Sequence, residues 1–452
     1  MSNKIFSNID EFYTVVNAAY AMPEAELYEK YGVKRGLRNS DGTGVMAGLT
    51  SIGDVYGYVI EDGERQPRDG RLRYRGIDVR DIVTGCREGG YFGFEEVAFL
   101  LLAGALPTKE QLNAFNEILD EYRALPAGFA EDMIMKAPSA NVMNKLARCV
   151  LASYSYDPNP DDISFNNILR QCIELIARFP TMAAYGYMAK SHYHDGKSLF
   201  IHQPQPGLST AENFLYMMRA DNQYTEAEAQ LLDLALVLHA EHGGGNNSAF
   251  AARVLSSSGT DTYSAISAAI GSLKGPKHGG ANAQVMGMID DFKANITDMT
   301  DAKQVSEHIV KILKKQTYDK KGLVYGMGHA IYTMSDPRAV LLKQKAKELA
   351  AEKDMMDEYT LYELIEQLTP GLFAEVKGDT KVICANVDLY SGFVYRMLGI
   401  PEELYTPLFA ISRITGWCAH RVEEVCTSNR IIRPAYKAVV SSQRGYVALD
   451  ER

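Results

Sequence analysis

The pattern of hydrophobic and polar positions divides the chain into a short β section and a long helical remainder. Alternating residues over Val55–Ile60 and Arg71–Arg75, with the turn residues Asp62 and Gly63 between them, predict a β-hairpin. From Gly93 onward, hydrophobic residues recur at helical spacing almost throughout. Because strands are scarce, we expect an all-α fold with a minor β-hairpin near the N-terminus.

Capping residues indicate where some of the expected helices begin. Thr225 and Glu228 form a capping box before a hydrophobic stripe that ends at three consecutive glycines. Asp336 and Pro337 are of the residue types preferred at the N-cap and in the first turn of a helix. Further helices are expected over residues 262–273 and 406–426, and an irregular, partly helical lead-in over residues 1–45.

Length and composition describe a globular protein with more than one domain. The chain has 452 residues, of which 46% are hydrophobic and 23% are charged. A single core usually stops growing at about 250–300 residues, so we expect two domains, or a large helical domain with a smaller one attached. The net charge of −10 argues against nucleic acid as the main partner. Any anionic ligand would need a locally positive site.

The cysteines and the hydrophobic runs predict a cytoplasmic protein. The six cysteines include no C-x-x-C pair, and so few in a long chain are typical of free thiols in a reducing compartment. Residues 1–13 contain no basic segment followed by a hydrophobic one, so no signal peptide is expected. The longest uncharged hydrophobic run, residues 97–106, is about half the length that a membrane helix needs.

Four segments combine histidines, glycines and charged residues in a way that is unusual for a core or a surface. They are residues 238–246 (LHAEHGGGN), 275–282 (GPKHGGAN), 326–338 (GMGHAIYTMSDPR) and 386–392 (NVDLYSG), with Arg413 further along the chain. Three of the nine histidines lie beside glycines at the ends of expected helices, where the backbone can approach a ligand closely.

Each of these residues also has an ordinary interpretation. A histidine beside glycines is often a loop or core residue that makes one hydrogen bond, and Asp388 could be a helix N-cap. Arg338 lies in the first turn of its helix, where the helix dipole favours acidic residues, which indicates another task such as holding an anion. The apolar neighbours of Arg413 indicate partial burial, and a buried arginine needs a carboxylate partner.

Taken together, in this order and at these separations, the four segments resemble the citrate synthase family. The likeness is strongest over residues 236–425 and extends loosely to residues 70–78. The resemblance implies a citrate synthase-like fold and a homodimer. It places residues 1–277 and 391–452 in a large helical domain, and residues 278–390 in a small domain between them.

The resemblance also implies an acyltransferase of the tricarboxylic acid cycle, which condenses acetyl-CoA with oxaloacetate through an enolate and hydrolyses the product thioester. Asp388 is then the base that removes a proton from the methyl carbon, and His278 donates a hydrogen bond to the thioester carbonyl. His329 donates to the ketone oxygen. We expect the dipole of the following helix to keep His278 uncharged.

The resemblance assigns the binding residues in the same way. It implies that oxaloacetate is bound by His242, His329, Arg338 and Arg413. It also implies that Arg433 binds oxaloacetate in the site of the partner subunit. Guanidinium groups suit carboxylates geometrically and supply the positive charge that the site needs. It implies that CoA is contacted by Gly326, Gly328, Lys381 and Asn386. It implies neither a metal nor a cofactor, because acetyl-CoA is a substrate.

Three other functions stay open at this point. A 2-methylcitrate synthase would use propionyl-CoA with the same residues, and one methylene changes discrimination by only ~1–3 kcal/mol. A metal hydrolase could use His239 and His242 with Glu241, or His192 with Asp195, although neither group has H-E-x-x-H spacing. A non-catalytic helical scaffold would need none of the four segments. Regulation and any assembly larger than a dimer also stay open.

Overall fold

The computed structural model describes residues 9–19, 25–379, 381–428, 430–439 and 445–451. The chain divides into two compact units, of which the first comprises residues 1–48 and 433–452 and the second comprises residues 49–432. The second unit holds every residue of the candidate site except Arg433. The boundaries expected for the large and small domains, residues 1–277, 278–390 and 391–452, stay a prediction.

The first unit contains short helices, as expected for the lead-in. These are α1 (Ile9–Ala19), α2 (Ala25–Lys30), η1 (Arg35–Leu37) and η5 (Leu449–Glu451). Residues 1–8 and 20–24 lie outside the described residues. The prediction for the lead-in covers both ranges, and the signal-peptide prediction covers the first of them.

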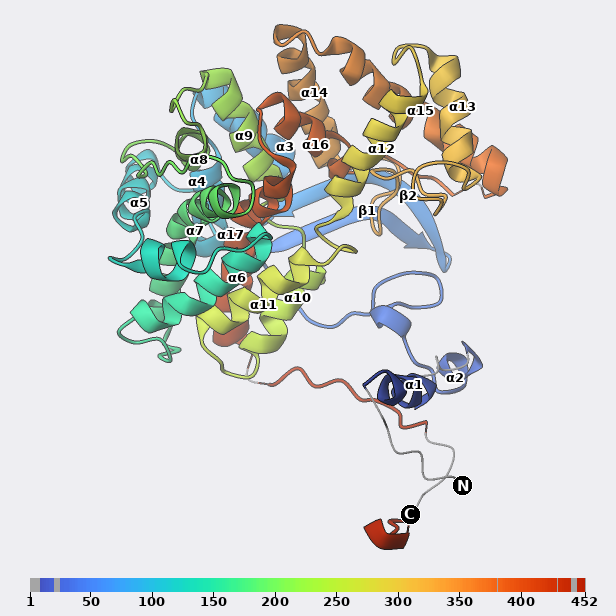
Figure 1. Cartoon of the computed structure of the whole chain (residues 1–452), viewed down its shortest axis with the longest axis horizontal. Coiled ribbons are helices and arrows are strands. Elements are labelled where there is room, and N and C mark those ends of the chain that lie inside the picture. Colours follow the sequence, from blue (N-terminus) through green and yellow to red (C-terminus); the bar gives the residue numbers. More distant parts are fainter. Residues whose placement is uncertain (1–8, 20–24, 380, 429, 440–444, 452) are drawn as a thin grey trace. The chain divides into compact units, whose positions relative to one another are not determined.

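The second unit begins with the predicted β-hairpin. Strands β1 (Gly53–Glu61) and β2 (Glu64–Tyr74) pair antiparallel, and the short β3 (Ile77–Asp78) pairs with β2. Asp62 and Gly63 have φ angles of 52° and 82°. Two positive φ angles in a two-residue turn match the twist of a hairpin, which explains why Asp-Gly occurs there. The hairpin is the pair of blue arrows in Figure 1.

The remainder of the second unit is helical, which confirms the all-α class. Figure 1 shows α12 to α16 grouped together, and α4 to α11 gathered around α17. The helices are α3 (Val79–Gly89), α4 (Phe94–Ala103), α5 (Lys109–Tyr122), η2 (Ala130–Met135), α6 (Val142–Ser153), η3 (Tyr154–Tyr156), α7 (Phe165–Tyr193), α8 (Thr210–Met218), α9 (Glu226–His239), α10 (Asn247–Ser256), α11 (Thr262–Lys274), α12 (Ala281–Asn295), α13 (Ala302–Leu313), α14 (Pro337–Glu352), α15 (Met356–Lys377), α16 (Val387–Met397), η4 (Glu402–Leu404) and α17 (Tyr405–Thr427).

The predicted helix starts are confirmed. Thr225 and Glu228 form both bonds of the capping box that opens α9. Asp336 caps α14, where its side chain accepts a hydrogen bond from the Arg338 amide, and Pro337 is the first helical residue. These local signals need no tertiary contact, because a side-chain cap satisfies amides that the first turn cannot bond internally.

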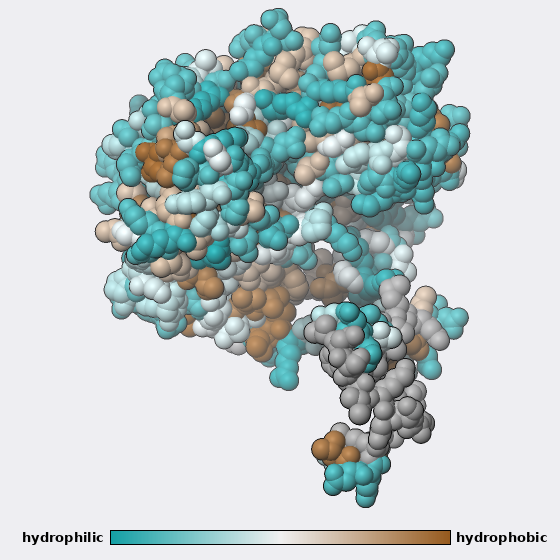
Figure 2. Space-filling model, in the orientation of Figure 1, coloured by the Kyte–Doolittle hydropathy of each residue, from teal (hydrophilic) through white to brown (hydrophobic). Residues whose placement is uncertain are grey.

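Helix α17 lies at the centre of the second unit. It packs against α4, α7, α9, α10 and α11, and its middle is buried. Helix α16 packs against α12 and α14. The face of the second unit shown in Figure 2 is mostly hydrophilic, with smaller hydrophobic areas. None of the described helices is long and apolar enough to cross a lipid bilayer.

Candidate active site

Helix ends and connections of the second unit bring the predicted residues together. The rings of His242 and His329 are 5.2 Å apart between centroids. The Arg413 guanidinium lies 4.7 Å from the centre of the Phe409 ring, and the His278 ring lies 6.4 Å from the same ring. His242 follows α9, His278 lies between α11 and α12, His329 precedes α14, Arg338 and Asp388 are in the first turns of α14 and α16, and Arg413 is within α17.

The backbone fixes the tautomer of His329. Its Nδ1 accepts hydrogen bonds from the amides of Ile331 and Tyr332, both at 3.1 Å. A backbone amide can only donate, so Nδ1 carries no proton and the neutral imidazole carries its proton on Nε2. His329 can therefore donate a hydrogen bond through Nε2.

His242 is held uncharged. Burial lowers the pKa of its imidazole well below the usual range, and the charges of Arg338 and His329 lower it further. Its Nε2 lies 3.2 Å from the hydroxyl of Tyr332. Sequence reasoning did not single out Tyr332, although it lies within residues 326–338, one of the four unusual segments, three residues after His329.

His278 is also uncharged at neutral pH. Burial and then the charge of Arg413 lower the pKa of His278 to about 4, and the contribution expected from the helix dipole stays a prediction. Its Nε2 lies 3.0 Å from the Ser248 hydroxyl. That hydroxyl accepts from Trp417 Nε1 at 3.0 Å and donates to Asn246 Oδ1 at 2.9 Å. His278 can donate through Nδ1 only when Ser248 gives its single proton to Nε2.

Asp388 has the properties of a base for neutral pH. Burial raises the pKa of its carboxyl to about 6, although the charge of Arg338 opposes this shift. Asn386, and not Asp388, is the N-cap of α16, and its Oδ1 accepts from the Asp388 amide at 3.0 Å. The capping interpretation of Asp388 is therefore wrong. No described residue donates a hydrogen bond to the carboxylate, so the charges of Arg338 and Arg413 favour its charged form without a direct bond.

Arg413 is fully buried, and only some of the hydrogen-bond donors of its guanidinium group have partners. Its Nε donates to the carbonyl oxygen of His239 at 2.6 Å, whereas neither terminal nitrogen has a hydrogen-bond partner among the described residues. Burial lowers the pKa of Arg413 to about 10, and the charge of Glu241 opposes the shift. We expected a carboxylate paired with this arginine, and no such ion pair occurs in the described part of the chain. Because unpaired buried donors are costly, the site favours an anion here.

Arg338 is anchored by its own helix cap. Its Nε and one terminal nitrogen donate to the two oxygens of Asp336 at 3.0 and 2.7 Å, and both residues are buried. This two-point pair fixes the plane of the guanidinium group. The anion-holding role predicted for Arg338 stays a prediction.

The residues expected to contact CoA mainly join two segments of the site. The Asn386 amide donates to the Gly326 oxygen at 2.9 Å, and Asn386 Nδ2 donates to the Gly328 oxygen at 2.8 Å. At Gly326, where φ is 80°, a side chain would meet Leu389 at 2.8 Å. These contacts hold the His329 segment against the start of α16. Lys381 is exposed. The CoA assignments stay predictions.

Two candidate residues remain, Arg433 and His239. Arg433 belongs to the first unit, and its role stays a prediction. His239 is 1% exposed and its Nδ1 donates to the Ala235 oxygen at 2.8 Å, as in an ordinary structural histidine. The described residues include no group of three or more His, Cys, Asp or Glu side chains placed to hold a metal ion.

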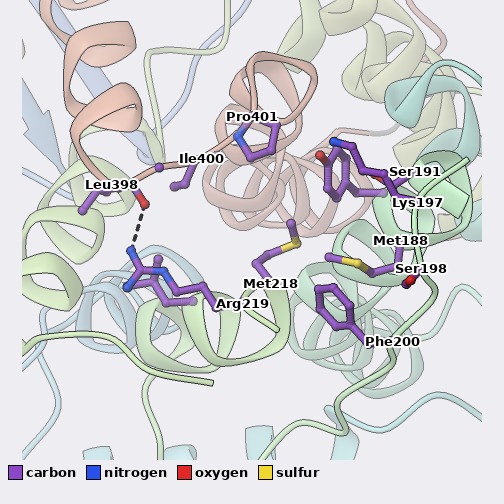
Figure 3. A pocket seen from close by; sticks show the side chains of 13 residues that line it. Met188, Ser191, Lys197, Ser198, Phe200, Met218, Arg219, Leu398, Ile400 and Pro401 are labelled. Carbon is purple, nitrogen blue, oxygen red and sulfur yellow. Dashed lines mark hydrogen bonds between the residues drawn. The ribbon is translucent and has the colours of Figure 1, made fainter. Parts of the chain in front are cut away.

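A cavity of about 220 Å³ lies apart from these residues, between the end of α16 and the α7–α8 region. Figure 3 shows Arg219 and Leu398 at one side of it, joined by a hydrogen bond of 2.8 Å, and Lys197 and Ser198 at the other. None of the predicted site residues lines it.

Comparisons with known proteins point to one family. The family model described as "Citrate synthase, C-terminal domain" matches residues 39–435. The citrate synthase of Haloferax volcanii is 36% identical over 85% of this chain and 93% of its own length. The 2-methylcitrate synthase 1 of Corynebacterium glutamicum is 33% identical over 93% of this chain and 98% of its own.

Solved structures show the same likeness. Citrate synthase from Thermoplasma acidophilum, in a ternary complex with carboxymethyl coenzyme A and oxaloacetate, matches with a TM-score of 0.75 and 27% identity, covering 92% of this chain and 99% of that chain. The enzyme from Pyrobaculum aerophilum matches with a TM-score of 0.72 and 30% identity, covering 90% and 94%. The chain therefore belongs to the citrate synthase family.

Proposed function

We propose that this protein condenses acetyl-CoA with oxaloacetate, forming citrate and CoA. The observation that carries the proposal is a single buried site that joins a carboxyl group of raised pKa to neutral imidazoles and to a guanidinium group with two unpaired nitrogens. A structural neighbour bound to oxaloacetate and carboxymethyl coenzyme A supports these two substrates. The reaction class is acyl transfer.

Asp388 begins the reaction. Its carboxylate takes a proton from the methyl carbon of the thioester, and the C–H electron pair moves toward the carbonyl oxygen to give an enol or enolate. His278 donates a hydrogen bond to that oxygen through Nδ1, which requires the Ser248 hydroxyl to turn its proton from Asn246 Oδ1 to His278 Nε2. A pKa of about 6 leaves Asp388 mostly ionised at pH 7 and still basic enough to act. Removing one donor of the His278 type typically costs about 10²–10³ in rate.

The enol carbon then attacks the ketone carbon of oxaloacetate. His329 supplies the proton to the ketone oxygen from Nε2, while His242, Arg338 and Arg413 hold the substrate and its carboxylates. Water then breaks the C–S bond of the product thioester, which releases the new carboxylate and the CoA thiol. The two arginines supply the local positive charge that an acidic protein must provide for anionic substrates.

We also propose that oxaloacetate binds first and closes two domains around it. His242 and Arg413 belong to the expected large domain, whereas His329 and Arg338 belong to the expected small one, so oxaloacetate would bridge the two. Closure would exclude water until the carbon–carbon bond has formed. Small-angle scattering with and without oxaloacetate tests this, and an unchanged radius of gyration would contradict it.

The assembly and location are part of the same proposal. A homodimer in the cytoplasm, with Arg433 offered to the partner's site, fits the family pattern. A hydrophobic area in Figure 2, over the region where Figure 1 places α10 and α11, supports a protein partner there. Sedimentation that gives the mass of one 50.1 kDa chain at micromolar concentration would contradict the dimer.

A second acyl substrate has a specific observation in its favour. The 33% identity to a 2-methylcitrate synthase extends over 93% of this chain, so propionyl-CoA is the alternative substrate. Oxaloacetate-dependent release of CoA, followed with a thiol reagent, tests both functions at once. We expect the larger kcat/KM with acetyl-CoA. A larger value with propionyl-CoA would favour the alternative, and no release with either would contradict both.

A further inference from the structure

Tyr332 lies at the centre of the site, although no role has been given to it so far. It is 2% exposed, and its hydroxyl is 3.2 Å from His242 Nε2. Its ring stacks on the His329 imidazole, with centroids 4.6 Å apart and planes inclined by 29°. The Arg338 guanidinium lies 5.6 Å from the centre of the same ring. One side chain therefore contacts three of the residues expected to bind oxaloacetate.

The Tyr332 hydroxyl decides which nitrogen of His242 carries the proton. Burial raises the phenol pKa well above its usual value, so the hydroxyl keeps its proton at neutral pH. His242 Nε2 is the one acceptor near this hydroxyl among the described residues. If Nε2 donated instead, the phenol proton would be buried without an acceptor, which is costly. The favoured arrangement has Tyr332 donating, with the proton of His242 on Nδ1.

The backbone and ring of Tyr332 act on His329 in a parallel way. The Tyr332 amide donates to His329 Nδ1 at 3.1 Å, which keeps the proton of that imidazole on Nε2. The stacked ring covers one face of the imidazole and limits its rotation. Both imidazoles therefore present an N–H group rather than a lone pair, as a ligand rich in carbonyl and carboxylate oxygens requires.

The β-hairpin holds Tyr332 in this position. A Cβ on Gly70 would lie 2.7 Å from the Tyr332 ring and 2.1 Å from the Ser335 oxygen, and a Cβ on Gly57 would lie 2.7 Å from the Tyr332 Cα. The Thr333 hydroxyl donates to the Gly57 oxygen at 2.5 Å, and the Gly70 amide donates to the Ser335 hydroxyl at 3.1 Å. The two glycines let the strands pack directly on the Tyr332 segment.

We infer that Tyr332 is a positioning residue, which sets the proton positions and orientations of His242 and His329 so that both donate to oxaloacetate. The inference rests on the proposed function. The side chain has two separate roles in this inference. The hydroxyl affects substrate binding through His242. The ring affects the transfer of a proton to the ketone oxygen through His329.

The test separates these two parts by steady-state kinetics. Tyr332→Phe removes only the hydroxyl, so we expect KM for oxaloacetate to rise about tenfold, with kcat within about threefold of the unsubstituted protein. Tyr332→Leu removes the ring as well, so kcat should fall about tenfold further. Tyr263→Phe is the matched control, because Tyr263 is 2% exposed and its hydroxyl donates to Asp157 at 2.7 Å outside the candidate site.

The outcomes are distinct. An unchanged KM in Tyr332→Phe, a fall in kcat alone, or an equal KM change in Tyr263→Phe would overturn the inference. Calorimetric titration of oxaloacetate into each variant repeats the test without turnover, and the Tyr332→Phe variant should bind about tenfold more weakly. If the unsubstituted protein released no CoA but bound oxaloacetate with this dependence on Tyr332, the proposed reaction would fail and the positioning role would stand.

Discussion

The raised pKa of Asp388 predicts that its carboxylate destabilises the folded protein at neutral pH. Burial raises this pKa from 3.8 to about 6, so between these values the folded state binds more protons than the unfolded state. The contribution of Asp388 to stability is therefore fully present below pH ~4 and is lost as pH rises through about 6. A shift of about 2 pKa units corresponds to ~3 kcal/mol in total.

Asp388→Asn removes the charge and keeps the shape, so this pH dependence should disappear in the variant. We expect the stability of the variant relative to the unsubstituted protein to rise by ~1.4 kcal/mol between pH 5 and pH 7.5. Taking the difference between two pH values cancels the pH-independent cost of burying the amide. Urea unfolding at both pH values and at one protein concentration measures it. A constant difference, or an advantage that is largest at pH 5, would refute the reasoning.

Three further predictions concern the same site. Ser248→Ala removes the hydroxyl that must turn from Asn246 to His278 Nε2 for His278 to donate through Nδ1, so kcat should fall about 10–100-fold with KM for oxaloacetate nearly unchanged; an unchanged kcat would contradict this role. The acid limb of kcat/KM for acetyl-CoA should have its midpoint at about pH 6, set by Asp388, and a flat profile down to pH 5 would argue against it. Gly70→Ala should destabilise the protein by ~1–3 kcal/mol in urea unfolding because its Cβ would overlap backbone, whereas Gly85→Ala, which meets open space in α3, should not; equal effects would contradict the packing argument.

Local signals in the sequence predicted much of the fold. The capping box at Thr225, the Asp-Gly turn of the hairpin and the Asp-Pro start of α14 all depend on neighbouring residues alone. Each is therefore visible in a short stretch of sequence. The family blocks likewise led to the predictions for the histidines and Asp388, because residue types and their spacing can be read directly from the linear chain.

The contacts that set proton positions were beyond prediction because they join distant segments. Ser248 meets both His278 and Trp417, which is 169 positions away, and Tyr332 meets His242 across 90 positions. Burial explains one further difference. It leaves Arg413 with unpaired nitrogens instead of the expected carboxylate. Neither the burial of a single polar side chain nor a contact between distant segments can be predicted from the periodicity of hydrophobic residues.

The central claim is that the Asp388 carboxylate removes the proton that allows the new carbon–carbon bond to form. The most direct measurement is the rate of citrate formation from methyl-labelled acetyl-CoA and oxaloacetate by Asp388→Ala. Asp81→Ala is the control, since Asp81 is an exposed aspartate in the first turn of α3. We predict that the Asp388 variant, folded as judged by thermal unfolding, is slower by about 10³-fold while the control is unchanged. A rate within about tenfold of the unsubstituted protein would contradict the account.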